Sequence, residues 1–282
     1  MLYGGIEAGG TKMVCAVMDD EGKIIDRVSF PTLGKDETLK KMVDYFKGFE
    51  IASLGIASFG PIDLNKSSDK YGCILRTPKE GWENVSFVEP FKELGVPIGI
   101  DTDVNGAILG EVVYGSAKGC ESAIYITIGT GIGVGLYING GLAHGLMHPE
   151  AGHILMTKHP EDKYDGCCKF HKNCFEGLAC GPSIQKRWGK PAVELYNESI
   201  VWEIESYYIA QAVADYCLCY SPEKVVLWGG VMHQDGLYDM IREKVADILN
   251  GYIPLPKDYI IPPSLGEDTG VIGAALIGKA LI

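Results

Sequence analysis

The sequence has few basic residues for its acidic content, with 25 Lys and Arg against 37 Asp and Glu, and a formal net charge of −12. A surface of that sign repels the phosphates of nucleic acids and of anionic lipids, so we expect neither nucleic acid nor a membrane as a partner. Low-complexity tracts are also missing, and 46% hydrophobic residues suit an ordinary folded protein. The 282 residues are enough for one large or two modest domains.

Charged residues are absent from positions 122–149, a run long enough to span a bilayer. Seven glycines in this run disfavour a helix, so we predict two buried strands and loops instead. No basic region or cleavable apolar segment follows Met1, which predicts a cytoplasmic protein. The nine cysteines are an odd number and are scattered, which favours reduced thiols and a metal site over a disulfide framework.

Hydrophobic periodicity divides the chain into two α/β halves. In the first half we predict strands at 2–8, 13–18, 24–30, 53–58 and 97–101, and helices at 36–49 and 104–114. In the second half we predict strands at 123–128, 132–138 and 224–228, and helices at 202–220, 237–249 and 269–280. We therefore expect one domain at 1–114 and another at 115–268, with a ligand in the cleft between them and the closing segment 269–282 packed back on the first domain.

Two glycine-rich turns occupy corresponding places in the two halves. The first is Gly9-Gly10-Thr11-Lys12, the second is Gly129-Thr130-Gly131-Ile132-Gly133, and each joins two predicted strands. Neither matches a Walker P-loop or a Rossmann fingerprint, and a simple hairpin turn would explain either alone. Together they predict two backbone cradles for a phosphate chain. Gly229-Gly230 follows another strand, where it either ends a buried strand or lets a nucleoside approach closely.

Three acidic side chains and one histidine are candidates for catalysis and substrate binding. Asp103 follows a predicted strand and begins a predicted helix, so it either caps the helix or serves as a carboxylate base. Glu150 and His153 follow the uncharged run, and Glu176 lies shortly downstream. These three either hold sugar hydroxyls or, in the case of the glutamates, form structural salt bridges.

Cys168, His171 and Cys174 recur at intervals of three residues, and His153 precedes them by fifteen. Thiolate and imidazole ligands at such spacing predict a zinc site, and four of them imply a structural ion. Cys167, His148 and His159 are competing donors, and the adjacent pair Cys167-Cys168 leaves the ligand ambiguous by one residue.

This combination of motifs resembles the ROK (repressor, open reading frame, kinase) family of sugar kinases over nearly the whole chain. Its details are similar to the bacterial zinc-containing fructokinase branch, including the segments at 59–61, 77–82 and 176–182. The resemblance implies an actin-like ATPase-domain (ribonuclease H-like) fold, with ATP, Mg²⁺ and a hexose as ligands. It further implies a homodimer, and fructose as the preferred hexose. Kinases of glucose, mannose or N-acetylmannosamine, and a non-catalytic sugar sensor, are the alternatives.

The same resemblance implies roles for individual residues. Asp103 would be the catalytic base. Asn105, Glu150, His153 and Glu176 would bind the sugar, and His153, Cys168, His171 and Cys174 the zinc. Gly9, Gly10, Thr11, Lys12, Thr130, Gly131, Pro182, Gly229 and Gly230 would line ATP. Glu7 stands where many relatives have Asp, which leaves open a water-mediated role at magnesium.

Overall fold

The computed structural model describes residues 1–77 and 79–282, so Pro78 of the 77–82 segment lies outside the described residues. The chain divides into two compact units. Unit 1 comprises Met1–Gly119, Leu142–Pro149 and Ser264–Ile282, and unit 2 comprises Cys120–Gly141 and Glu150–Pro263. Across the described positions, the structure contains no helix with the length and apolar character needed to cross a membrane.

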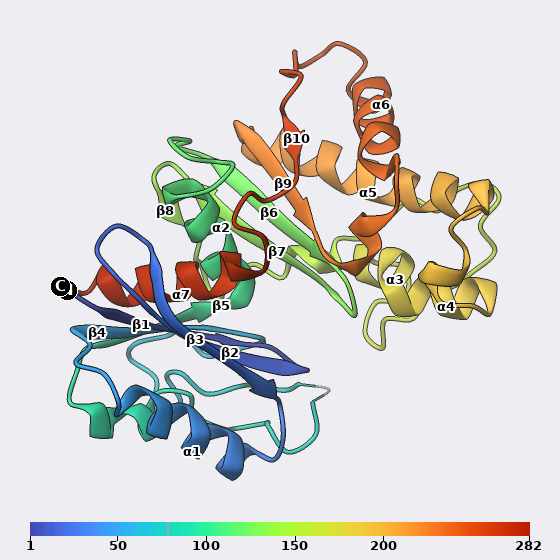
Figure 1. Cartoon of the computed structure of the whole chain (residues 1–282). Coiled ribbons are helices and arrows are strands. Elements are labelled where there is room, and N and C mark those ends of the chain that lie inside the picture. Colours follow the sequence, from blue (N-terminus) through green and yellow to red (C-terminus); the bar gives the residue numbers. More distant parts are fainter. Residues whose placement is uncertain (78) are drawn as a thin grey trace. The chain divides into compact units, whose positions relative to one another are not determined.

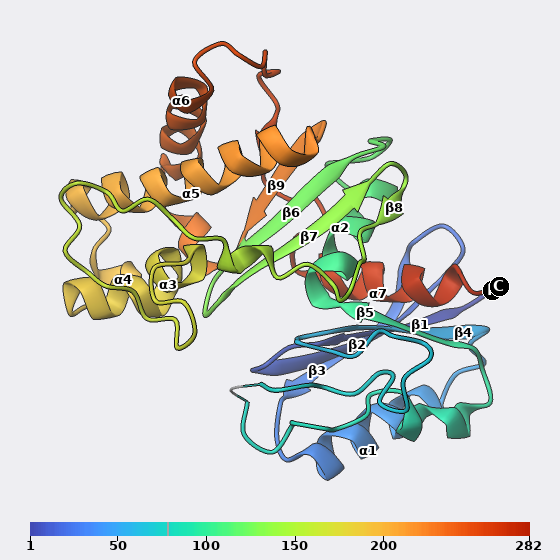
Figure 2. The same cartoon turned by 180° about the vertical axis from the view of Figure 1, so that it is seen from behind.

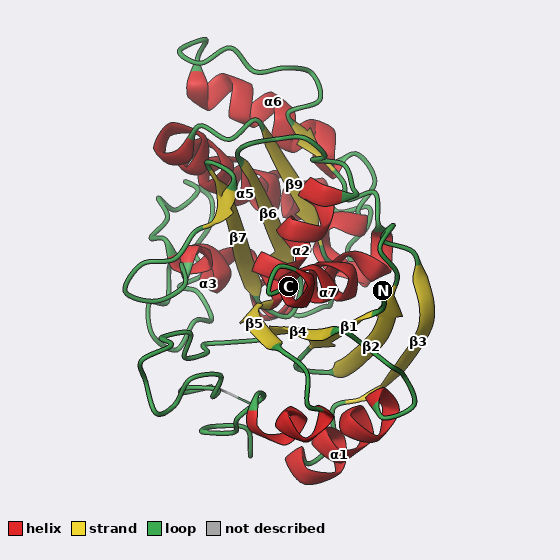
Figure 3. Cartoon of the chain, turned by 90° about the vertical axis from the view of Figure 1, so that its left-hand side faces the viewer, coloured by secondary structure: helices red, strands yellow, loops and turns green. Residues whose placement is uncertain are grey.

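Unit 1 is built on a five-stranded sheet in the order β3-β2-β1-β4-β5 (Figure 3). Its first three strands are antiparallel, and β1, β4 and β5 are parallel. The register places Ala8, Ser58 and Thr102 side by side at the ends of these parallel strands. The residues that follow them therefore leave the sheet at the same edge. The strands are β1 (Tyr3–Ala8), β2 (Lys12–Met18), β3 (Ile24–Pro31), β4 (Ser53–Ser58) and β5 (Ile98–Thr102).

Helices cover both faces of this sheet. Figure 1 shows α1 (Lys35–Phe46) on one face and α7 (Thr269–Lys279) on the other, where α2 (Asp103–Val113) also lies. The short 3-10 helices η1 (Glu89–Leu94) and η5 (Gly266–Asp268) complete the unit. On the α1 side, Met42 and Phe46 pack into the main hydrophobic core. On the other side the backbones meet closely, because a Cβ at Gly273 would lie 1.6 Å from the carbonyl oxygen of Gly106.

A buried carboxylate fastens the third segment of unit 1. Glu111 on α2 is fully buried and accepts hydrogen bonds from the backbone N–H groups of Ser264 (3.1 Å) and Leu265 (3.2 Å) and from the hydroxyl of Thr269 (3.0 Å). Buried acceptors with several donors are stabilising, because nothing is left unsatisfied. Glu111 thereby fixes the start of α7.

Unit 2 contains a second five-stranded sheet, in the order β10-β9-β6-β7-β8. The parallel neighbours β6 and β9 place Thr127 opposite Trp228, so the turns after them share one edge. Two helices of this unit, α5 and α6, pack against each other, and Figure 2 shows α6 crossing the direction of α5. The strands are β6 (Ala123–Ile128), β7 (Ile132–Ile138), β8 (Gly141–Leu142), β9 (Lys224–Trp228) and β10 (Ile260–Ile261), and the helices are η2 (Ala151–His153), α3 (Phe175–Ala179), α4 (Gly181–Trp188), η3 (Ala192–Glu194), α5 (Ser199–Tyr220), η4 (Gly230–His233) and α6 (Leu237–Leu249).

Most predicted elements are found, and the differences lie at their ends. The first helix ends at Phe46 instead of residue 49, because the chain turns at Lys47 and Gly48. Of the two roles considered for Asp103, the capping role is wrong: the cap of α2 is Thr102, whose backbone is extended and whose hydroxyl oxygen accepts from the N–H of Asn105 (3.1 Å). Asp103 is the first residue inside the helix. Its carboxylate is therefore not used as the cap.

Candidate active site and metal site

Asp103 lies at the edge of the unit 1 sheet where β1, β4 and β5 end. Its side chain is partly exposed, and its Oδ1 accepts from the N–H of Val104 (2.9 Å). Burial raises the pKa of Asp103 to about 6, although the backbone hydrogen bonds oppose this shift. A carboxylate with such a pKa is ionised at neutral pH and is still basic enough to take a proton from a hydroxyl during its attack.

Glu7, at the end of β1, forms a second acidic group in this region. Its Oε2 is buried and has no hydrogen-bond partner among the described residues. Burial, and then the negative charge of Asp103, raise the pKa of Glu7 to about 7. A Cβ at Gly270 would lie 2.5 Å from Cδ of Glu7, so the absence of a side chain there makes room for this carboxyl.

The first glycine-rich turn follows β1 at the same edge. The N–H of Gly9 donates to the carbonyl of Lys12 (3.0 Å), and Gly10, Thr11 and Lys12 are exposed. The ammonium of Lys79 donates to the carbonyl of Gly10. The turn thus presents exposed backbone and cationic groups, which suits an anionic ligand.

Asn105, on the first turn of α2, is buried and held from two sides. Its N–H is capped by Thr102, and its Nδ2 donates to Oδ1 of Asp101 (2.8 Å). The other oxygen of Asp101 lies 2.8 Å from Nε2 of His144. Sequence reasoning did not single out His144 or this role of Asp101, although a histidine within an uncharged run was a usable signal.

In unit 2 the second glycine-rich turn meets Glu176. Oε2 of Glu176 accepts from the N–H of Ile132 (3.1 Å), and a Cβ at Gly131 would lie 2.7 Å from that oxygen. The N–H of Gly181, which begins α4 before Pro182, donates to the carbonyl of Gly129 (2.8 Å). The turn containing Thr130 is therefore joined to the ends of α3 and α4.

Gly229 is placed at the same edge of unit 2. It follows β9, has φ +108°, and a Cβ there would lie 2.3 Å from the carbonyl oxygen of Ile128. A side chain at this position would be both strained and obstructed. The structure thus brings together the unit 2 residues predicted to line ATP, namely Thr130, Gly131, Pro182, Gly229 and Gly230.

The four predicted metal ligands come together in unit 2. The ligand atoms of His153, Cys168, His171 and Cys174 all lie within 4.8 Å of one another. Nδ1 of His153 is 3.4 Å from Sγ of Cys174 and 3.8 Å from Sγ of Cys168. Two thiols and two imidazoles are a ligand set that suits zinc. These residues therefore fit a possible zinc site.

The other ring nitrogen of His153 faces away from the sulfur atoms. Its Nε2 lies 4.0 Å from Oε2 of Glu150. One histidine can thus bind a metal through Nδ1 while its Nε2 faces a carboxylate, an arrangement that fixes the ring orientation. The metal site and Glu150 are coupled through this residue.

The competing metal donors contact other groups. Sγ of Cys167 lies 3.0 Å from Oγ of Ser183 and 3.6 Å from Sγ of Cys180, which resolves the ambiguity in favour of Cys168. His148 accepts from the N–H of Ile62 (3.2 Å). His159 accepts from the N–H of Glu161 (3.2 Å).

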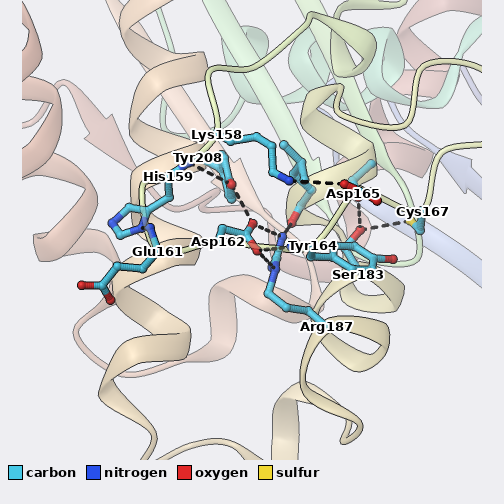
Figure 4. Close-up of polar contacts among 12 residues, drawn as sticks. Lys158, His159, Glu161, Asp162, Tyr164, Asp165, Cys167, Ser183, Arg187 and Tyr208 are labelled. Carbon is cyan, nitrogen blue, oxygen red and sulfur yellow. Dashed lines mark hydrogen bonds and ion pairs between the residues drawn. The ribbon is translucent and has the colours of Figure 1, made fainter.

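A buried ion pair holds the segment between the metal ligands (Figure 4). The guanidinium of Arg187 donates to Asp162 through Nε (3.1 Å) and lies 3.0 Å from its other oxygen through Nη2. Asp162 also accepts from the hydroxyl of Tyr208 (2.7 Å) and the N–H of Tyr164 (2.9 Å). The side chain of Arg187 is 6% exposed and that of Asp162 is 1% exposed. Each buried charge is therefore stabilised mainly by the opposite charge of the other residue. The pair joins this segment to α4 and α5.

A family model described as the ROK family matches residues 3–280, and the chain belongs to this family. A Bacillus subtilis (strain 168) protein is 50% identical to it, covering 98% of this chain and 95% of the relative. The fructokinase of Streptococcus mutans (serotype c) is 46% identical, covering 99% of this chain and 96% of the relative.

A solved structure of a ROK hexokinase from Thermus thermophilus has a TM-score of 0.85 at 25% identity and covers 100% of this chain and 99% of that one. A ROK glucokinase from Streptomyces griseus, solved with glucose and AMPPNP, has a TM-score of 0.75 at 24% identity and covers 99% of this chain and 100% of that one. The predicted fold class, an actin-like ATPase fold, is confirmed.

Proposed function

We propose that this protein is an ATP-dependent fructokinase, which converts D-fructose to D-fructose 6-phosphate. The relatives named fructokinase are 41% to 46% identical to it, whereas a relative named glucokinase, from Thermotoga maritima, is 26% identical. This difference supports fructose over glucose.

The observation that carries the chemistry is the place of Asp103. Its partly exposed carboxylate stands at the same edge of the sheet as the first glycine-rich turn, free of the capping role that Thr102 takes. In the proposed reaction Asp103 takes the proton of the 6-hydroxyl as the oxygen of that hydroxyl attacks the γ-phosphorus of ATP and the bond from phosphorus to the β–γ bridging oxygen breaks. A carboxylate ionised at neutral pH suits this step.

The other roles are assigned as follows. Asn105, Glu150, His153 and Glu176 would hold the ring hydroxyls of the sugar. Backbone N–H groups of the two glycine-rich turns would bind the phosphates, with Mg²⁺ neutralising their charge. The residues assigned to ATP are Gly9, Gly10, Thr11, Lys12, Thr130, Gly131, Pro182, Gly229 and Gly230.

Zinc would have a structural role in this proposal. Bound by His153, Cys168, His171 and Cys174, it would fix the loop that leads to Glu176 and, through His153, the position of Glu150. The protein would act as a homodimer, and it would do so in the cytoplasm, where thiols stay reduced.

The test is a panel of hexoses with coupled detection of ADP. We expect fructose to have the highest kcat/KM among fructose, mannose, glucose and N-acetylmannosamine, because a mismatched hydroxyl leaves buried partners unpaired at about 1–3 kcal/mol each. A tenfold advantage for glucose or the amino sugar would refute the assignment to fructose, and ATP hydrolysis without phosphorylation of any sugar would refute the kinase.

A further inference from the structure

His144 is a partly exposed histidine to which the proposed mechanism gives no task. It belongs to Leu142–Pro149, the short segment of unit 1 that lies far from the rest of the unit in sequence. Its Nε2 lies 2.8 Å from Oδ2 of Asp101, 43 residues away in the chain. The side chain of Asp101 is 7% exposed and that of His144 is 40% exposed. A buried carboxylate is thus closed on one side by an imidazole that solvent reaches.

The other oxygen of Asp101 determines how the amide of Asn105 is turned. Oδ1 of Asp101 accepts from Nδ2 of Asn105 (2.8 Å) and from the N–H of Thr102 (2.7 Å). Because the amide nitrogen of Asn105 faces Asp101, its amide oxygen points away from that carboxylate. The result is a chain of contacts from His144 through Asp101 to the orientation of one amide, two residues after Asp103.

The charges around His144 favour its protonated form. The hydrogen bond with Asp101 raises the pKa of His144, and a backbone hydrogen bond involving Leu142 adds to this, while burial opposes it. The other titratable groups near the pair are His148, whose own pKa is lowered by burial, and Tyr71, whose pKa is raised by burial and by Asp101. The hydrogen bond with Asp101 is therefore the largest influence on the pKa of His144.

We propose that His144 is a positioning residue for sugar binding: by pairing with Asp101 it fixes the amide of Asn105, whose oxygen then accepts a hydrogen bond from a hydroxyl of the hexose. This inference rests on the proposed function, in which Asn105 contacts the sugar. His144 itself does not touch the reacting atoms. Its loss should therefore weaken sugar binding far more than it slows phosphoryl transfer.

The kinetic test compares three variants at pH 7. In His144→Leu, Asp101 keeps a buried charge without its partner, and we expect the KM for fructose to rise by about tenfold or more while kcat and the KM for ATP change by less than about threefold. In His144→Gln, a neutral amide replaces the imidazolium as donor, so the KM should recover only to the value that the unmodified protein reaches above the pKa of His144. Leu146→Gln is the matched control, because Leu146 is fully exposed in the same segment and should have no effect.

The pH dependence separates positioning from a merely structural role. A raised pKa means that the charged pair is complete below that pKa and is lost as the pH rises through it. In the unmodified protein the KM for fructose should therefore increase several-fold as the pH rises through the pKa of His144. His144→Gln cannot titrate, so its KM should stay flat over the same range. A fall in melting temperature alone, with the KM for fructose unchanged in His144→Leu, would overturn the inference.

A second measurement does not depend on turnover. The pKa of His144, followed by NMR of its ring, should lie above the ordinary value near 6.5 and should fall in Asp101→Asn. The side-chain amide signals of Asn105 should shift in His144→Leu and not in Leu146→Gln. An unshifted His144 would overturn the pairing whatever the enzyme does. Absence of turnover with every hexose, together with the expected NMR shifts, would instead refute the proposed function and leave the pairing established.

Discussion

Replacing Arg187 with Met should destabilise unit 2 strongly. The change keeps much of the aliphatic side chain and removes the guanidinium. Asp162 is then a carboxylate with a side chain 1% exposed, and its remaining donors among the described residues are the hydroxyl of Tyr208 and the N–H of Tyr164. It also removes a donor to the carbonyl of Leu178 (2.7 Å). Breaking a buried pair in this way costs about 3–5 kcal/mol in the free energy of unfolding.

The measurement is urea unfolding followed by tryptophan fluorescence, with Asp165→Asn as the control. Asp165 pairs with Lys158 at 3.5 Å in the same loop but is 89% exposed (Figure 4), so its replacement should cost less than about 0.5 kcal/mol. Combining Arg187→Met with Asp162→Leu removes both charges and should recover part of the loss. If Arg187→Met costs no more than the control, the buried pair is not what holds this loop.

Three further predictions concern the active site and the metal. Asp103→Asn should lower kcat by about a hundredfold or more, while calorimetry should show that fructose still binds. In the unmodified protein kcat should fall as the pH drops below about 6, because the base must be ionised. Unchanged turnover in Asp103→Asn would exclude Asp103 as the base. Cys174→Ser, or chelation, should remove about one zinc per chain and lower the melting temperature, and elemental analysis showing no zinc in protein purified without chelator would contradict the metal site. Gly131→Ala should reduce kcat/KM by about tenfold by displacing Glu176, whereas Gly141→Ala, where a Cβ meets open space, should match the unmodified enzyme.

Local patterns were enough to predict the longer strands and helices, whereas the short elements β8, α3, α4 and β10 were not predicted. The strands at 53–58, 123–128 and 224–228 have the predicted bounds, because runs of buried apolar residues between turn residues are determined locally. The metal set could be predicted for a similar reason: its three closest members lie within seven residues of one another.

Contacts between distant segments could not be predicted. The pairing of His144 with Asp101 spans 43 residues, and that of Arg187 with Asp162 spans 25. Neither pair follows a periodic pattern in the sequence, so only the structure shows which acidic side chain pairs with which basic one. The cap of α2 was missed for a smaller reason: Thr102 and Asp103 are both good capping residues, and the choice depends on where the extended backbone of β5 ends.

The discontinuous make-up of unit 1 has a consequence for the order in which the protein forms during synthesis. Residues 264–282 leave the ribosome after all of unit 2, yet they supply α7 and the donors to Glu111. Until then, the carboxylate of Glu111 has, among the described residues, the N–H and the hydroxyl of Ser116 as its donors, and the glycine-lined face of the sheet lacks α7, whereas every segment of unit 2 is already present. We therefore expect unit 2 to become protected first. Hydrogen exchange on a chain truncated after Pro263 should show slow amides in β6 and β9 and fast ones in β1 and β4; equal protection in both sheets would contradict this order.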